Sequence, residues 1–131
     1  MFNKVTLIGR LGKNAEVRTA QNQKDYAVLS IATSESWKNQ NGEFESRTEW
    51  HRIYAWGNLA NFAKNLSKGQ LAALEGKIKY RTVEETVAGK PFTHAIAEIH
   101  ASSMKRLSKA QAADDPAGGA DENVDFDAPL D

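Results

Sequence analysis

The chain has 131 residues, 40% hydrophobic and 26% charged with no net charge, a balance typical of a folded domain rather than a disordered protein. It contains no cysteine, which excludes disulfides, thiolate zinc sites and a cysteine nucleophile. No apolar run approaches the ~20 residues that span a bilayer, and no signal-peptide region precedes the first strand pattern, so a cytoplasmic protein is expected.

The first half of the chain predicts three strands. Residues 4–10 form the first strand, and residues 26–37 form the second. A polar segment over residues 38–46 contains Asn41-Gly42, whose tolerance of positive φ is typical of a tight hairpin turn. Residues 47–56 then form the third strand.

One helix follows, with Asn58 as its N-terminal cap and Lys68-Gly69 at its end. Its apolar residues share one face. They are Leu59, Phe62, Ala63 and Leu66. Residues 71–82, with a predicted bulge at Gly76, form the fourth strand, and residues 92–107 form the fifth. This order predicts an all-β OB-fold over residues 1–107, a five-stranded Greek-key barrel with one helix between strands three and four.

The third strand carries the most informative pattern. Alternation places four side chains on one face, Trp50, Arg52, Tyr54 and Trp56. Flat rings can stack on bases and a cation can meet phosphate, so this face predicts a surface for single-stranded nucleic acid. An oligomer interface, which also favours Trp, Tyr and Arg, is the alternative. The opposite face is apolar, and its His51 is expected in the core or at a subunit contact.

The fourth strand adds cations. Lys77, Lys79 and Arg81 alternate along one face, which indicates contact with a polyanion; an edge strand protected by charge is the alternative. Trp37 comes directly before the projecting polar loop, and Phe44 lies within that loop. Both could extend the stacking surface.

Other chemistries have little support. His94, Glu98 and His100 share a strand face and could ligate zinc, but no further residue supports such a site. The sequence has no P-loop and no GxSxG motif. A nuclease would need paired carboxylates on the basic face, and Glu49 and Glu75 do not form a pair. No catalytic activity, metal or cofactor is therefore expected.

The last residues, 108–131, are rich in Ala, Gly, Asp and Pro and lack periodicity, which predicts a disordered tail. All 17 lysines and arginines lie in residues 4–109, whereas seven of the 17 acidic residues lie beyond residue 110, so residues 1–110 carry +7 and residues 111–131 carry −7. A basic body suits a polyanion, and an acidic tail with apolar anchors suits docking on proteins or competition with DNA; an inert solubility tail is the alternative. The tail residues expected to bind partners are Asp125, Phe126, Asp127, Pro129, Leu130 and Asp131.

Residues 1–107 resemble the bacterial single-stranded DNA-binding proteins. The matching segments are residues 3–12 (NKVTLIGRLG), 16–18 (EVR), 32–37 (ATSESW), 48–52 (TEWHR) and 74–77 (LEGK). The resemblance implies an OB-fold homotetramer around which single-stranded DNA winds without sequence preference. It also implies stacking roles for Trp37, Trp50 and Trp56, and places His51 at the subunit interface.

The chain departs from the family at two places. Val83 stands where relatives often have Trp, and the chain ends in Pro129-Leu130-Asp131 where a terminal Pro-Phe is usual. The expected function is that of a non-catalytic, nucleoid-associated protein. It coats and protects single-stranded DNA in replication, recombination and repair, and its tail recruits replication and repair proteins. A primosomal-type OB-fold adaptor, which binds proteins, is the alternative.

Overall fold

The computed structural model describes residues 1–108, so residues 109–131 of the predicted tail, with all of its partner-binding residues, lie outside the described part of the chain. The elements are β1 (Val5–Leu11), β2 (Glu16–Thr19), β3 (Asp25–Lys38), β4 (Phe44–Trp56), α1 (Asn58–Ala63), β5 (Leu71–Val87) and β6 (Lys90–Arg106). The five predicted strands and the helix are therefore present. The short β2 was not predicted, because four exposed residues leave no hydrophobic alternation to read.

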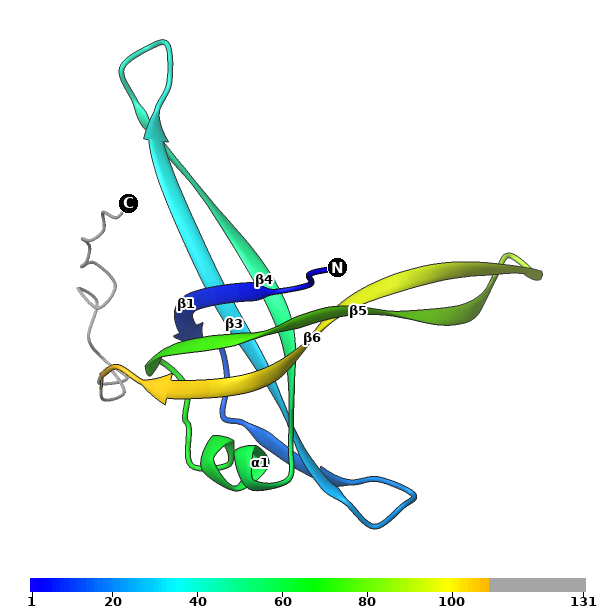
Figure 1. The fold of residues 1–131 in the computed structure, drawn as a ribbon. Coiled ribbons are helices and arrows are strands. Elements are labelled where there is room, and N and C mark those ends of the chain that lie inside the picture. Colours follow the sequence, from blue (N-terminus) through cyan, green and yellow to red (C-terminus); the bar gives the residue numbers. More distant parts are fainter. Residues whose placement is uncertain (109–131) are drawn as a thin grey trace.

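The strands close into a barrel because β1 pairs at both of its edges. The sheet runs β1-β5-β6-β4-β3-β2, and the end of β1 also pairs with β3 through Arg10↔Ala32 and Leu11↔Ile31. The five-stranded barrel of an OB-fold is thus formed by β1, β3, β4, β5 and β6 (Figure 1). The short β2 is not part of the barrel and pairs with the first residues of β3. A β-carbon on Gly9 would lie 2.2 Å from the carbonyl oxygen of Ala32, so closure requires glycine here.

The core lies inside this barrel. Its largest fully buried side chains are Leu29, Ile31, Ile53 and Leu74. They come from β3, β4 and β5, where alternate residues turn inward. The helix α1 covers one end of the barrel (Figure 1).

Three predictions about the helix were wrong: its cap, the burial of Phe62 and its end. Gly57, with φ 62° and ψ −128°, is the N-cap, and Asn58 makes no side-chain capping bond. Phe62 is 38% exposed, whereas Ala60 and Ala63 are buried. The helix ends at Ala63 and not at Lys68-Gly69. Leu59 packs against the core and Leu66, beyond the helix, is buried in it, as predicted. No helix within residues 1–108 is long and apolar enough to cross a membrane.

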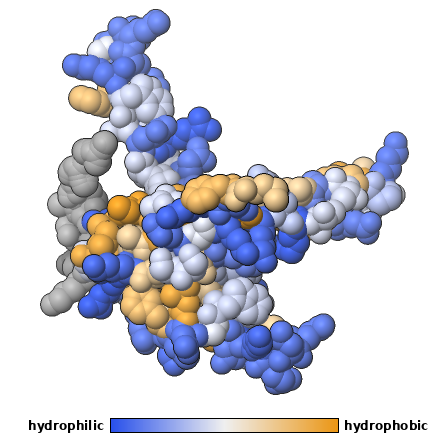
Figure 2. All heavy atoms as spheres, in the orientation of Figure 1, coloured by the Kyte–Doolittle hydropathy of each residue, from blue (hydrophilic) through white to orange (hydrophobic). Residues whose placement is uncertain are grey.

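Two long hairpins leave the barrel as arms (Figure 1). The β3–β4 arm comprises residues 34–48 and turns at Gly42, whose φ of 81° confirms the predicted hairpin. The β5–β6 arm comprises residues 80–97 and turns at Ala88 and Gly89, both at positive φ. Hydrophobic side chains gather over the barrel, whereas the tips of both arms are hydrophilic (Figure 2). The bulge predicted at Gly76 is confirmed by a register shift between Glu75 and Gly76.

Candidate nucleic-acid interface

The strand β4 separates its side chains as pleating requires. Trp50 and Trp56 are 62% and 39% exposed, and Arg52 between them is also exposed. Ile53 and Ala55 alternate with these residues and are completely buried. The outer face of β4 therefore displays two indole rings and a cation.

The rings of β4 join two others in a stacked row. Tyr26 of β3 stacks on Trp56, with ring centroids 4.7 Å apart, and on Tyr54, 6.0 Å away. Tyr54 in turn stacks on His100 of β6, at 5.1 Å and with 12° between the planes. We call Trp56, Tyr26, Tyr54 and His100 the aromatic row. Three strands contribute to it, so it forms one continuous surface of π-faces.

Sequence reasoning missed Tyr26 and His100. A signal for Tyr26 existed, because it alternates with the buried Ala27 and Leu29 and so must face outward. His100 joins the row only because β4 and β6 pair in parallel and place Tyr54 opposite His100. That pairing brings together strands far apart in the sequence, so no local pattern indicates it.

Tyr54 supports the row through its hydroxyl group as well as its ring. Arg52 Nε donates a hydrogen bond to the Tyr54 hydroxyl oxygen at 3.0 Å. Glu98, whose side chain is only 6% exposed, accepts a hydrogen bond from Arg81 Nε at 2.8 Å and also interacts with Tyr54. His100 Nε2 lies 3.7 Å from the second Glu98 oxygen. The buried carboxylate therefore connects β4, β5 and β6 beneath the row.

This network shifts the pKa values of its members. Burial opposes the ionisation of Glu98, but hydrogen bonds from Arg81 and Tyr54 and the charge of Arg81 outweigh it and lower the pKa of Glu98. The hydrogen bond and charge of Glu98 raise the pKa of Arg81. Burial lowers the pKa of His100, and the positive charge of Lys79 adds to this effect. Glu98 is therefore an anion that balances Arg81, and His100 favours its neutral form.

The lysines beside the row carry no such counter-ion. Lys77 pairs in register with His100, and Lys79 pairs with Glu98, so both lie on the face of the aromatic row. Both are exposed and neither forms an ion pair within residues 1–108. They line a hollow of about 610 Å³ together with Trp56 and His100, which we call the lysine hollow. Of the three cations predicted on β5, the two lysines are thus free to meet an external anion.

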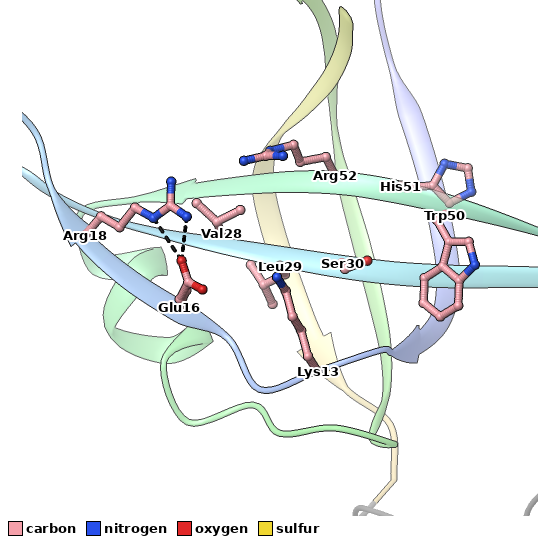
Figure 3. A pocket seen from close by; sticks show the side chains of 9 residues that line it. All are labelled: Lys13, Glu16, Arg18, Val28, Leu29, Ser30, Trp50, His51 and Arg52. Atoms are coloured by element: carbon pink, nitrogen blue, oxygen red, sulfur yellow. Dashed lines mark hydrogen bonds and ion pairs between the residues drawn. The ribbon is translucent and has the colours of Figure 1, made fainter.

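A second, smaller hollow lies on the other side of the row. It has a volume of about 200 Å³ and is lined by Lys13, Arg18, Arg52 and Trp50 among others; we call it the arginine hollow. Figure 3 shows the ion pair of Arg18 with Glu16 at one end, Trp50 at the other and Lys13 between them. The hydrogen bond to Glu16 raises the pKa of Arg18, and a hydrogen bond with Tyr26 adds to it.

Sequence reasoning assigned no role to Lys13 or Arg18. Lys13 lies outside any regular element, and Arg18 belongs to the unpredicted β2. Arg18 reaches the interface because β2 pairs with β3 and places it opposite Tyr26. Lys13 follows Gly12, whose amide donates a hydrogen bond to the Ser30 carbonyl oxygen of β3. The outer face thus has cations on both sides of the stacked rings, an arrangement that can hold bases and phosphates together.

The model of the single-strand binding protein family matches residues 2–107. The chain belongs to this family. It is 44% identical over 108 residues to the single-stranded DNA-binding protein of Neisseria meningitidis, covering 81% of this chain and 60% of that protein. It is 39% identical over 89 residues to single-stranded DNA-binding protein 1 of Chlorobaculum tepidum, covering 67% and 55%. The chain thus spans little more than half the length of these relatives.

The fold is also that of solved family members. The chain is similar to the Plasmodium falciparum SSB, solved as a complex with ssDNA, with a TM-score of 0.68 and 29% identity. The match covers 82% of this chain and 96% of that one. The OB-fold predicted from the order of elements is therefore confirmed.

The structure separates Trp37 from the rest of the predicted site. Trp37 pairs with Glu45, and alternation along β3 places it on the face of the hairpin opposite to Trp50. It is exposed on the β3–β4 arm and does not join the aromatic row. His51 does not join the aromatic row, but it lines the arginine hollow with Trp50 and Arg52, and its Nε2 lies 2.8 Å from Thr33 Oγ1. Phe44, predicted in the loop, is the first residue of β4, and its ring lies under the ammonium group of Lys38.

The face of the lysines continues onto the β5–β6 arm. Val83 pairs with His94. Phe92 stacks on His94 with ring centroids 5.3 Å apart, and His94 Nε2 lies 2.7 Å from a Glu85 oxygen. An exposed aromatic ring is thus present near Val83 on the same face.

The suggested zinc ligands are not assembled. His94 contacts Glu85, and Glu98 contacts Arg81. No group of three or more side chains within residues 1–108 is arranged to hold a metal ion.

Proposed function

We propose that this protein binds single-stranded DNA without sequence preference. It coats and protects that DNA in replication, recombination and repair, and it catalyses no reaction. The observation that carries the proposal is the aromatic row between two cationic hollows. Stacking on an aromatic ring contributes ~1–3 kcal/mol per base and tolerates any base, because every base has a π-face.

The DNA crosses the sheet from one hollow to the other. Trp50 and Arg52 receive it at the arginine hollow, the aromatic row lies beneath its bases, and Lys77 and Lys79 meet its phosphates at the lysine hollow. Arg81 has a different role, because Glu98 already balances its charge. Arg81 positions the buried carboxylate under Tyr54, and Trp37 contacts DNA that continues along the β3–β4 arm.

The test is a titration with oligo-dT of about 15 nucleotides, a length within the site size of one OB-fold. Binding quenches tryptophan fluorescence, and Trp56→Ala raises Kd by about 5- to 150-fold, the equivalent of ~1–3 kcal/mol. Oligomers of dA and dC bind with similar affinity. Log Kobs falls with log[salt] at about −0.7 per phosphate neutralised. Tight binding of a protein partner with only weak DNA binding would favour the adaptor function instead.

The protein also assembles as a homotetramer, with His51 at a subunit contact. The support is an unpaired strand edge: residues 5–9 of β1 pair only with β5 within residues 1–108, and Ile8 is exposed there. Light scattering gives the mass of four chains, and His51→Lys, which places a charge in the contact, lowers it. A monomer at micromolar concentration would contradict this assembly.

The tail recruits replication and repair proteins, and the protein works in the cytoplasm on the nucleoid. The support is the composition of residues 111–131, which carry a formal charge of −7 and contain the apolar anchors Phe126 and Leu130. The double variant Phe126→Ala, Leu130→Ala loses these partners in pull-down experiments but keeps its affinity for oligo-dT. Unchanged partner capture would contradict the role of these two anchors.

A further inference from the structure

We infer that Phe2 closes the lysine hollow and holds one nucleobase of the DNA strand against Trp56. This inference rests on the proposed function and adds a binding residue to it. Phe2 and Trp56 both line the hollow, together with Lys77 and Lys79. Two aromatic rings and two free cations match the two parts of a nucleotide, since rings stack on a base and ammonium groups meet a phosphate.

The hollow is large enough for this ligand and lies next to the aromatic row. Its volume is about 610 Å³, within the range of small-molecule sites. Trp56 forms one end of the row, and His100, at the other end, also lines the hollow. A base held on Trp56 therefore continues the stack that the protein has already built.

Phe2 is exposed, and the residue that follows it is held in place. The Phe2 side chain is 88% exposed, which is unfavourable for an aromatic hydrocarbon in water. The next residue, Asn3, donates a hydrogen bond from Nδ2 to the Ile78 carbonyl oxygen at 2.9 Å. Asn3 Oδ1 accepts one from the Ile78 amide at 3.0 Å. Through these two bonds the side chain of Asn3 pairs with the backbone of β5 just before β1 begins. They hold Phe2, the preceding residue, at the rim of the hollow.

The charges around Phe2 leave the two lysines for the ligand. Lys4 and Glu75 also line the hollow, and they pair with each other, with Nζ and Oε2 3.4 Å apart. Their charges cancel. Lys77 and Lys79 have no such partner within residues 1–108, so the hollow attracts an anion. The ligand class is a nucleotide unit of single-stranded DNA.

A double-mutant cycle with oligo-dT of about 15 nucleotides tests whether Phe2 and Trp56 hold the same base. Phe2→Ala raises Kd about fivefold or more, the equivalent of ~1 kcal/mol. In a Trp56→Ala background the same change alters Kd by less than about twofold, because the shared base is already lost. The matched control is Phe62→Ala, which removes an exposed phenyl ring that lines neither hollow and leaves Kd unchanged.

Two substitutions of Phe2 distinguish stacking of its ring on a base from simple burial of apolar surface. Phe2→Tyr keeps the π-face and keeps the affinity, whereas Phe2→Leu keeps apolar bulk and loses it. Asn3→Ala releases the segment and weakens binding when Phe2 is present but not in the Phe2→Ala background. This dependence on Phe2 would be absent if Asn3 served only stability.

The outcomes distinguish this inference from the proposed function. If Trp56→Ala weakens binding and Phe2→Ala does not, the role of Phe2 is refuted and DNA binding stands. If the two losses simply add, the residues do not share a base and the inference also fails. If neither variant changes the affinity, both the role of Phe2 and the assigned DNA-binding face are overturned.

Discussion

A methyl group on Gly12 tests whether the position of Trp50 matters for DNA binding. A β-carbon on Gly12 would lie 2.4 Å from one carbon of the Trp50 ring and 2.9 Å from a second. Non-bonded carbon atoms rest about 3.5–4.0 Å apart, so in Gly12→Ala the indole must retreat by about 1 Å or more. The backbone of Gly12 is anchored by its hydrogen bond to the Ser30 carbonyl oxygen at 2.9 Å. The ring therefore moves and the backbone does not.

Displacement of the Trp50 ring removes the stacking of one base on it. One stack contributes ~1–3 kcal/mol, so Gly12→Ala is expected to raise Kd for oligo-dT by about 5- to 150-fold. The assay is fluorescence anisotropy of a labelled oligonucleotide, because the tryptophan signal itself changes when Trp50 moves. Urea denaturation of the same variant separates lost affinity from lost stability.

The control is the same substitution in a Trp50→Ala background. There the methyl group meets no ring, and Kd is expected to change by less than about twofold. Wild-type affinity in Gly12→Ala would show that Trp50 binds no base in its present position. An equal loss in both backgrounds would show that Gly12 acts through another contact.

Three further predictions concern the β5–β6 arm, the buried carboxylate and barrel closure. Phe92→Ala is expected to weaken the binding of an oligo-dT several times longer than one OB-fold site. Tyr80→Ala, on the opposite face of the same arm, should leave that affinity unchanged. If calorimetric titrations gave equal losses of affinity for the two variants, the DNA would not follow one face of the arm. Glu98 contributes stability above its ordinary pKa of 4.5, and this is lost as pH falls through its lowered value in the folded protein. Urea midpoints between pH 8 and pH 3 should therefore fall less steeply below pH 4.5 in Glu98→Gln, and an unchanged slope would contradict the pairing. Gly9→Ala forces β1 away from Ala32 and destabilises the protein by ~1–3 kcal/mol in urea denaturation; a neutral effect would mean that the barrel closes without this close approach.

Much of the fold could be predicted because its signals are local. Side chains alternate along a pleated strand whatever the strand pairs with, so the burial of Ile53 and the exposure of Trp50 and Trp56 follow from the order of residues. Gly42 and Gly76 mark a turn and a bulge for equally local reasons. The prediction that Phe62 of α1 faces the core was wrong, because the space between helix and barrel accepts Ala60 and excludes Phe62. Helical periodicity alone does not specify that space.

The interface itself depends on which strands meet, and in which register. The stacking of Tyr26 on Trp56 and of Tyr54 on His100 requires the β3–β4 and β4–β6 pairings, and the latter is parallel. The partnership of Arg81 with Glu98 likewise follows from the β5–β6 register.

The amino-acid order therefore sets which face of each strand carries rings and cations, because the two-residue period belongs to the single chain. Barrel closure decides which of those rings touch and which cations stay free. Register depends on all the strands at once, and only the closed barrel defines it.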